Sequence, residues 1–273
     1  MYEIVYKRNL NNNVTLMKIQ APLIAKKAKP GQFIMLRIDD VGERIPLTIA
    51  DYDRKNGTIS IIFQEVGQTT IKLAKLSKGD FLIDFVGPLG KSSDLSEYKK
   101  ACVIGGGLGI AIAYPQAKEL NNQGCKVDII AGFRNRDSII LEDECKGVCE
   151  DLYITTDDGS NGNKGFVTDM LKKQLENKTY DLVIAIGPLI MMKFVCKITK
   201  EYNIKTIVSM NPIMVDGTGM CGGCRVTVGG KTKFACVDGP DFDGHLVNFD
   251  EAMMRQGMYK KEEEHQCNLE KIK

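Results

Sequence analysis

The stretch from Ala101 to Phe133, ACVIGGGLGIAIAYPQAKELNNQGCKVDIIAGF, predicts a strand, a glycine-rich turn, a helix and a second strand. The pattern continues along the chain. Strands are predicted in DLYITTDDG, YDLVIAIGP and KTIVSM, with helices in GFVTDMLKKQLENK and LIMMKFVCKITKEYNI. Strands that alternate with helices of this length form a parallel, doubly wound sheet. We therefore predict an α/β domain over residues 96–209.

Residues 1–95 show a different pattern, with short runs rich in β-branched residues between turn signals. The runs are YEIVYK, NVTLMKI, GQFIMLRI, PLTIADY, TISIIFQ and DFLIDFVG. Several short strands at this spacing predict a small antiparallel barrel or sandwich. One helix is expected in TTIKLAKLSKGD, with Thr69 or Thr70 as its N-cap.

The last part, residues 210–273, contains Cys221, Cys224 and Cys236 among glycines. Thiolates bind soft or borderline metals, and glycines let a loop wrap closely around a cluster, which favours an iron–sulfur cluster. Two other readings stay open: a zinc site with His245 as its fourth ligand, and a reducible C-x-x-C pair. The end, KKEEEHQCNLEKIK, is predicted to be a solvated helix or a frayed tail.

The composition excludes several classes of function. The 273 residues carry a net charge of +2 with acidic and basic residues interspersed, so no surface for nucleic acid is indicated. No apolar run has the length of a membrane span, and the first residues lack the pattern of a signal peptide. Nine cysteines without such a signal are atypical of a disulfide scaffold. We expect a cytoplasmic protein.

The glycine turn of the α/β domain is a candidate nucleotide site. Its glycines let the backbone approach a pyrophosphate, and the following helix offers free N–H groups. A strict G-x-G-x-x-G pattern would need glycine at Ile110, and a ligand-free turn is the alternative. At the same sheet edge, Asp157 and Asp158 are candidates to bind ribose hydroxyls or to form a turn. The candidates are Gly105, Gly106, Gly107, Leu108, Gly109, Ile110, Asp157, Asp158, Gly159, Gly187 and Pro188.

The order of these parts, with the segments RIPLTIAD, GGGLGIA, TTDDGSNGNKG, GPLIMMK and MVDGTGMCGGCRVTVGG, resembles the ferredoxin–NADP reductase superfamily. Within it, the chain is similar to the electron-transfer subunit of dihydroorotate dehydrogenase. It resembles more closely the small subunit of NADH-dependent reduced ferredoxin:NADP oxidoreductase, also described as a sulfide dehydrogenase subunit. The resemblance implies FAD on the β-barrel, a nicotinamide nucleotide in the α/β domain and a 2Fe–2S cluster in the last lobe.

The resemblance also implies which residues contact FAD. The candidate catalytic residue is Thr48, which would lie beside the flavin. The other expected FAD contacts are Pro46 and Leu47 on its strand, Ile62, Phe63 and Gln64 on the next long strand, and Thr69 and Thr70 at the pyrophosphate.

The flavin motif departs from the family pattern in one position. The family places an arginine three residues before the Ser or Thr, where this chain has Ile45, so Arg44 is the candidate one place out of register. A second departure is Ile186, which stands where the superfamily often has a cysteine near the nicotinamide. No thiol is therefore expected to assist hydride transfer at that position.

The cysteine motif departs from the dihydroorotate type. Those subunits read C-G-x-G-x-C-x-x-C before a later cysteine, whereas this chain reads D-G-T-G-M-C-G-G-C. The resemblance to the ferredoxin:NADP type implies that Asp216 is a ligand together with Cys221, Cys224 and Cys236. A carboxylate is a harder donor than a thiolate, and such a change alters the potential of a cluster. Cys267 is the next candidate if the fourth ligand lies elsewhere.

The implied function is transfer of a hydride from NADH to FAD, followed by single-electron transfer through the cluster to a partner. The expected partner is a larger subunit with a further FAD and 4Fe–4S clusters, in a heteromer that performs electron bifurcation. One alternative is the dihydroorotate dehydrogenase electron-transfer subunit, and another is a zinc-stabilised nucleotide-binding regulatory protein. NADP(H) is the alternative nucleotide, because Arg134 and Arg136 are candidates to hold a 2′-phosphate.

Overall fold

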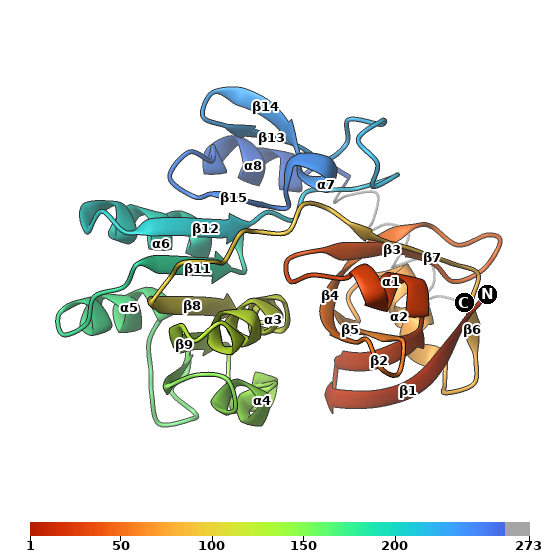
Figure 1. Ribbon diagram of the computed structural model, residues 1–273, viewed down its shortest axis with the longest axis horizontal. Helices are drawn as coiled ribbons and strands as arrows, with labels where there is room; N and C mark the ends of the chain where they lie inside the picture. The colour runs from red at the N-terminus through yellow and green to blue at the C-terminus, as the bar shows by residue number, and fades with distance from the viewer. Residues whose placement is uncertain (260–273) are drawn as a thin grey trace.

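The computed structural model describes residues 1–259, which form a β-barrel, a parallel sheet covered by helices, and a small C-terminal lobe (Figure 1). The predicted tail and Cys267 lie outside the described residues. Within residues 1–259, no helix has the length and apolar character needed to cross a membrane.

The barrel confirms the predicted antiparallel fold. Its seven strands run in the order β6-β1-β2-β5-β4-β3-β7. Along β5, Ile61 and Phe63 belong to the apolar interior, whereas Ile62 points to the other face, as the two-residue repeat of a strand requires. The strands are β1 (Tyr2–Asn11), β2 (Val14–Gln20), β3 (Phe33–Arg37), β4 (Ile45–Asp53), β5 (Thr58–Gln64), β6 (Phe81–Leu82) and β7 (Asp84–Leu89).

Two helices accompany the barrel. Helix α1 (Pro22–Lys27) has proline in its first turn and had no counterpart in the sequence prediction. Helix α2 (Gln68–Lys75) was predicted, but the choice of Thr69 or Thr70 as its N-cap was wrong, because Gly67 holds that position. The Thr70 hydroxyl instead accepts a hydrogen bond from the Gly67 amide at 3.0 Å, so this threonine closes the start of the helix from inside its first turn.

The second sheet confirms the predicted doubly wound fold, with the order β10-β9-β8-β11-β12-β15. Its first five strands are parallel, and β15 adds an antiparallel edge. Helices lie on both faces, with α3 and α4 on one and α5 and α6 on the other. The elements are β8 (Lys100–Gly106), α3 (Gly109–Asn122), β9 (Lys126–Phe133), α4 (Glu142–Lys146), β10 (Asp151–Thr156), α5 (Val167–Leu175), β11 (Leu182–Ile186), α6 (Leu189–Glu201), β12 (Lys205–Ser209) and β15 (Asp241–Asp243).

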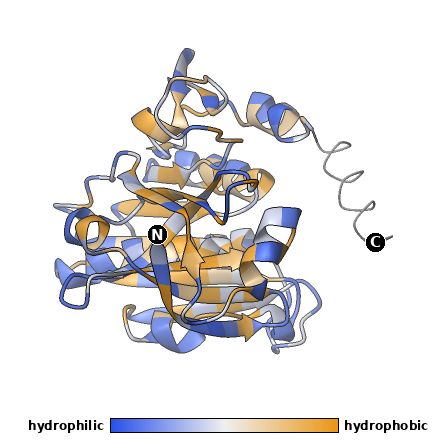
Figure 2. Ribbon diagram, turned by 90° about the vertical axis from the view of Figure 1, so that its right-hand side faces the viewer, coloured by the Kyte–Doolittle hydropathy of each residue, from blue (hydrophilic) through white to orange (hydrophobic). Residues whose placement is uncertain are grey.

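An apolar seam joins the barrel to the α/β domain. Val14, Ala50 and Ile62 on the outer barrel face are buried in the same cluster as α3. Lys118 of α3 adds an ion pair with Asp51 of β4 at 2.9 Å. Figure 2 shows the apolar residues concentrated along the strands, with polar residues in the surrounding loops. The two large parts are therefore held by buried apolar surface as well as by the linker between them.

The C-terminal lobe is small and is anchored to the second sheet. It contains the hairpin of β13 (Arg225–Val228) and β14 (Lys231–Phe234), followed by α7 (Ala235–Asp238) and α8 (Phe249–Gln256). Strand β15 lies within residues 210–273, yet it pairs with β12 of the α/β domain. The boundaries at residues 95 and 209 stay a prediction, and the sheet itself runs across the second one.

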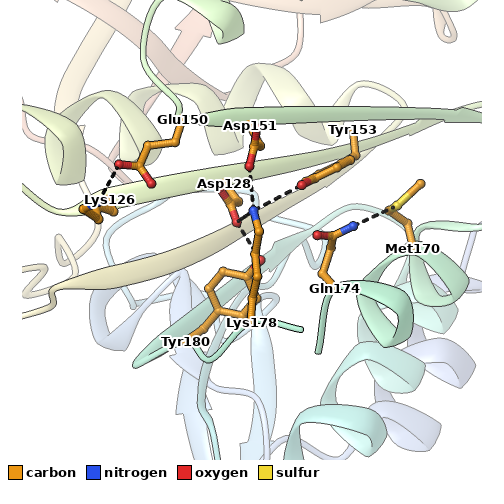
Figure 3. Close-up of polar contacts among 9 residues, drawn as sticks. All are labelled: Lys126, Asp128, Glu150, Asp151, Tyr153, Met170, Gln174, Lys178 and Tyr180. Carbon is orange, nitrogen blue, oxygen red and sulfur yellow. Dashed lines mark hydrogen bonds and ion pairs between the residues drawn. The ribbon is translucent and has the colours of Figure 1, made fainter. Parts of the chain in front are cut away.

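A buried ion pair stabilises the strand ends of the second sheet that lie away from the glycine turn (Figure 3). Lys178 reaches Asp128 at 2.7 Å and Asp151 at 2.6 Å, and the Tyr180 hydroxyl donates to Asp128 at 2.7 Å. The carboxylate side chain of Asp128 is 2% exposed, so it depends on these donors for its charge to be tolerated. The hydrogen bonds to Asp128 and Asp151 outweigh desolvation and raise the pKa of Lys178, which stays charged.

We predict that Lys178→Met lowers the free energy of unfolding by about 2–3 kcal/mol, because it leaves the Asp128 carboxylate buried without its cation. The matched control is Lys126→Met, which removes an exposed pair with Glu150 and is expected to cost at most about 1 kcal/mol. Urea unfolding followed by circular dichroism measures both changes. Equal losses in the two variants would contradict this account of the network.

Candidate functional site

The glycine turn of β8 and α3 leaves no room for side chains at three of its positions, Gly105, Gly106 and Gly109. A Cβ on Gly109 would lie 2.2 Å from the carbonyl oxygen of Ile186, so α3 begins directly against the end of β11. A Cβ on Gly106 would lie 2.5 Å from the sulfur of Met191. Gly107 has a φ of +56° and open space around its Cβ position, so the tip of the turn faces outward. This is the geometry of a backbone that admits a phosphate group.

The ends of β9 and β10 contribute the rest of this edge. Asp158 forms a turn, because its Oδ1 accepts hydrogen bonds from the amide and the hydroxyl of Ser160. These bonds lower the pKa of Asp158, with the Ser160 hydroxyl as the largest cause. Asp157 is exposed beside it, and Arg134 and Arg136 are exposed at the end of β9. Of the two aspartates, Asp158 is therefore a turn residue, and Asp157 is the one available to a ribose.

Two further observations fit a bound nucleotide at this edge. The hydroxyl of Thr155, near the end of β10, is buried and has no hydrogen-bond partner among the described residues. Gly187 follows β11 and approaches Gly106, since a Cβ on Gly187 would lie 3.1 Å from the Gly106 backbone. Pro188 then serves as the N-cap of α6. The predicted residues of the three strand ends are thus brought together.

The predicted flavin residues divide between two faces of the barrel. Pro46 and Thr48 pair across the strands with Met35 and Phe33, which lie on the outer face. Leu47 packs against the barrel interior instead. The same division holds on β5, where Ile62 is outside. Phe63 is only 1% exposed inside the barrel, so a flavin outside can meet its backbone but not its ring.

Two other predicted FAD contacts, Arg44 and Thr69, lie next to the ends of β4 and β5. The Arg44 guanidinium is 3.5 Å from Asp84, which also pairs with Arg37 at 2.8 Å. This interaction directs Arg44 along the barrel surface, and its proposed phosphate contact would require it to leave Asp84. Thr69 lies in the first turn of α2 and is half-buried. Three residues separate the end of β5 from the start of this helix, and a helix start is a general phosphate-binding element.

The three cysteines of the lobe are arranged unequally. Cys224 and Cys236 are buried, and their sulfur atoms lie 3.2 Å apart, whereas Cys221 is exposed. The pair in sulfur–sulfur contact is therefore Cys224 and Cys236, which is not the C-x-x-C pair. The Gly223 amide donates to the sulfur of Cys221 and the Cys236 amide to that of Cys224, both at 3.4 Å. Burial, assisted by Cys224, raises the pKa of the Cys236 thiol to about 12.

Asp216 organises the loop that carries these cysteines. Its Oδ1 accepts a hydrogen bond from the Thr218 amide and its Oδ2 one from the Cys221 amide, each at 3.0 Å. These bonds, with that from Thr218 the largest cause, lower the pKa of Asp216, so the group is a carboxylate at neutral pH. After burial and Cys224, the charge of Asp216 adds a smaller contribution to the raised pKa of Cys236.

The donor types suit an iron–sulfur cluster, with three sulfur atoms, one carboxylate and backbone amides directed at the sulfurs. Among residues 1–259, no set of three or more ligating side chains is already arranged around a common point. His245, the zinc-ligand candidate, contacts the Thr199 hydroxyl of α6 at 3.0 Å. It therefore has a partner in the α/β domain.

The cysteine loop lies on the outer face of the barrel near β4, the strand that carries Pro46 and Thr48 and is called the flavin strand below. A Cβ on Gly217 would be 2.8 Å from Met35 and 3.0 Å from Leu89, so the loop backbone rests on β3 and β7. Met35 is the cross-strand partner of Pro46, and it shares one apolar cluster with Cys224 and Cys236. The parallel strands point their carboxyl ends toward the barrel, so the nucleotide edge faces the same region (Figure 1).

Comparison with known proteins agrees with this arrangement. Residues 211–248 match the iron–sulfur cluster binding domain of dihydroorotate dehydrogenase B, and residues 103–197 match the oxidoreductase NAD-binding domain. A Thermotoga maritima homolog of the dihydroorotate dehydrogenase B (NAD(+)) electron transfer subunit is 45% identical, with 96% of this chain and 92% of the relative covered. A Clostridium perfringens electron transfer subunit of that enzyme is 33% identical over 89% of this chain and 98% of its own. 

One solved structure extends the comparison to three dimensions. A chain in the structure of NADH-dependent reduced ferredoxin-NADP oxidoreductase, studied for flavin-based electron bifurcation, superposes with a TM-score of 0.95. It is 43% identical, and the match covers 100% of this chain and 98% of that one. Ferredoxin reductase structures below 20% identity, such as that of carbazole 1,9a-dioxygenase at a TM-score of 0.60, share the fold.

The chain belongs to the family of dihydroorotate dehydrogenase B electron-transfer subunits, within the ferredoxin–NADP reductase superfamily. It is an NAD(P)H-dependent flavin and iron–sulfur oxidoreductase subunit whose cofactors are FAD, a 2Fe–2S cluster and NAD(H). The residues that the fold brings together suit this set: an open glycine turn, an outer barrel face and a loop of sulfur and carboxylate donors.

We predict distinct outcomes for three substitutions of Asp216. Asp216→Cys should keep a 2Fe–2S cluster with an altered EPR signal and potential, because a softer donor replaces the carboxylate. Asp216→Ala should weaken or lose the cluster. Asp216→Asn keeps an oxygen acceptor for one of the two loop amides and removes the charge, so it should also weaken the cluster, but less than Asp216→Ala does. Iron content and EPR spectra measure each result, with Asp250→Ala on α8 as the control.

An unchanged spectrum in Asp216→Ala would place the fourth ligand elsewhere, with Cys267 as the next residue to test. 

We predict that Gly109→Ala weakens nicotinamide nucleotide binding at least about tenfold, because the added methyl group meets the Ile186 carbonyl and displaces the start of α3. The control is Gly147→Ala at the end of α4, where the nearest atom to a Cβ is 3.4 Å away. Calorimetric titration with NADH gives the Kd of each variant. The same affinity in both would show that the close packing at Gly109 does not shape the binding turn.

Proposed function

We propose that this chain exchanges a hydride between NAD(H) and FAD and passes single electrons through a 2Fe–2S cluster to a partner subunit. FAD, when bound, accepts two electrons at once and releases them singly, which matches the one-electron capacity of the cluster. The observation that carries the proposal is the contact of the Gly217 backbone with Met35, whose strand partner is Pro46. The cysteine loop and the flavin strand are therefore neighbours.

The chain's own residues have separable tasks in this proposal. The turn from Gly105 to Ile110 and the start of α3 bind the nucleotide phosphates, and Asp157 is available to a ribose. Pro46 and Thr48 present the barrel surface on which the flavin ring rests, with Thr48 as the hydrogen-bonding group beside the reacting atoms. Ile186 is 2% exposed and packs in the apolar cluster of α3, so this position offers no thiol to the nicotinamide.

Electrons would leave the molecule through the cysteine loop. Cys224 and Cys236 lie on its buried side, whereas Cys221 is exposed and follows Met220, which is 89% exposed. We propose that this side faces the larger flavin and 4Fe–4S subunit, in a heterodimeric ferredoxin:NADP oxidoreductase complex capable of bifurcation. The 43% identity to the chain of the NADH-dependent reduced ferredoxin-NADP oxidoreductase structure supports this partner.

The second candidate is the electron-transfer subunit of dihydroorotate dehydrogenase, which the similarity to the Thermotoga maritima homolog favours. Asp216, in place of the first cysteine, favours the ferredoxin type. Purification of the native complex separates the two, since one partner would carry 4Fe–4S clusters and the other an FMN barrel. A zinc-stabilised regulatory protein would require a colourless chain with stoichiometric zinc.

We predict that the purified chain shows flavin and 2Fe–2S absorption and that NADH bleaches the flavin faster than NADPH. The exposed Arg134 and Arg136 are the residues that would favour the 2′-phosphate of NADPH, so replacing both by alanine should lower NADPH reactivity more than NADH reactivity. Anaerobic stopped-flow absorbance at saturating nucleotide measures both rates. A faster reaction with NADPH would overturn the nucleotide assignment.

A further inference from the structure

A buried junction joins the three parts of the molecule away from the cysteines. The linker after β7 pairs with the lobe, since the Lys91 amide donates to the Gly239 carbonyl at 2.5 Å. The lobe pairs with the α/β domain, since the Met210 amide donates to the Pro240 carbonyl at 2.9 Å. We define the junction by the five residues whose side chains or backbone meet at its centre: Gly31, Ser93, Gln116, Ser209 and Asp241.

Asp241 is the residue that all the other members contact. Its Oδ2 accepts hydrogen bonds from the Ser93 hydroxyl at 2.8 Å and from the Gln116 amide at 3.1 Å. Ser209 is the cross-strand partner of Asp241, which places its hydroxyl near this carboxyl group. On the barrel side, a Cβ on Gly31 would lie 2.6 Å from Oδ2, so the turn before β3 presses directly on the carboxyl. One side chain thus links the linker, α3, β12 and the barrel.

Two buried acceptor atoms at the junction have no hydrogen-bond donor. The other carboxyl oxygen, Oδ1 of Asp241, is buried without a partner, and so is the amide oxygen Oε1 of Gln116. Both atoms are acceptors, and Gln116 is itself completely buried. Two buried acceptors without a donor are costly, and a proton on the carboxyl converts one of them into a donor.

We propose that Asp241 is a positioning residue that holds the cysteine lobe against the barrel and α3, and that it does so most tightly when its carboxyl group is protonated. Only the effect on electron transfer rests on the proposed function. The lobe it positions carries the cysteine loop, so loosening the junction changes the separation of that loop from the flavin strand.

No charged partner offsets ionisation at the junction, because Ser93 and Gln116, which bond Asp241, and the nearby Ser209 are all neutral. Burial raises its pKa to about 6, from an ordinary value near 3.8. The charged side chains on the neighbouring elements are either paired elsewhere or exposed. Lys118 pairs with Asp51, Glu119 with Gln123, Lys205 with Tyr98, Asp94 with Ser96 and Asp243 with the His245 amide, while Lys29 and Lys91 are exposed.

The sign of the effect follows from the raised pKa. Below about pH 4 the carboxyl is protonated in both the folded and the unfolded chain, so its burial costs nothing extra. Between about pH 4 and pH 6 the unfolded chain ionises while the folded chain resists, and stability is lost. Above about pH 6 the folded carboxyl is ionised as well, and the loss reaches its full size.

The first test is an infrared titration of the full chain with its cofactors. In the difference between the spectra of the unmodified protein and Asp241→Asn, the carbonyl stretch of a protonated carboxylic acid should be present at pH 5 and disappear with a midpoint near pH 6. Absence of this band from the difference spectrum at pH 5 would overturn the proposal. So would the lack, in the unmodified protein alone, of any such band that titrates near pH 6.

The second test compares melting temperatures. Asn at position 241 is neutral and offers an N–H to the unpaired acceptor, so Asp241→Asn should gain in Tm over the unmodified protein as pH rises from 4 to 6, and hold that gain at pH 8. The control is Asp243→Asn on the exposed side of β15, whose difference from the unmodified protein should not change over this window. A Tm difference for Asp241→Asn that does not depend on pH would contradict the proposal.

The third test asks whether the junction positions the lobe. The rate of cluster reduction by NADH, divided by the rate of flavin reduction, should be equal in the unmodified protein and Asp241→Asn at pH 5. It should be several-fold lower in the unmodified protein at pH 7.5. A ratio that stays equal at both pH values would show that the junction does not position the lobe. Failure of NADH to reduce the cluster in every variant would count against the proposed function, while the infrared and melting tests would still decide the state of Asp241.

Discussion

The pairing of β15 with β12 is the constraint on which the arrangement of the sites depends. The chain leaves the parallel sheet at Met210 and returns to it at Asp241, and the Met210 amide is bonded to the carbonyl of the residue before that return. The segment between Met210 and Asp241, which carries the three cysteines, therefore has both of its ends fixed at one edge of the sheet. Because the carboxyl ends of the parallel strands face the barrel, this segment lies at the barrel surface (Figure 1).

The order of the three sites follows from this anchoring. The glycine turn lies at the strand ends, the flavin strand lies on the barrel, and Gly217 brings the cysteine loop onto Met35 beside that strand. An apolar cluster that contains Met35, Cys224 and Cys236 fills the space between barrel and lobe. Electron transfer requires cofactors at short, fixed separations, and here the separations are set by backbone pairing and apolar packing. The hydrogen-bonded junction at Asp241 adds the polar part of the same attachment.

Much of this could be read from the sequence, because local patterns determine local structure. The alternation of strands and helices after Ala101 predicted the doubly wound sheet, and the glycine turn and the cysteines marked two sites. Such local patterns do not predict contacts between segments that are distant in the sequence. The tripeptide of β15 carries no strand signal, α1 is too short to show periodicity, and Phe63 is turned inside by the register of β5. Thr70 caps α2 from within because the chain enters the helix earlier, at Gly67.

We predict that this chain alone contains the complete electron-transfer route from NADH to the cluster. The direct measurement is EPR spectroscopy of the purified chain, frozen within seconds of mixing with NADH in the absence of oxygen and of any partner. The predicted result is the signal of a reduced 2Fe–2S cluster, at close to one spin per chain when NADH is in excess. A bleached flavin with no cluster signal would contradict the account, because the cysteine loop would then not receive electrons from the neighbouring flavin strand.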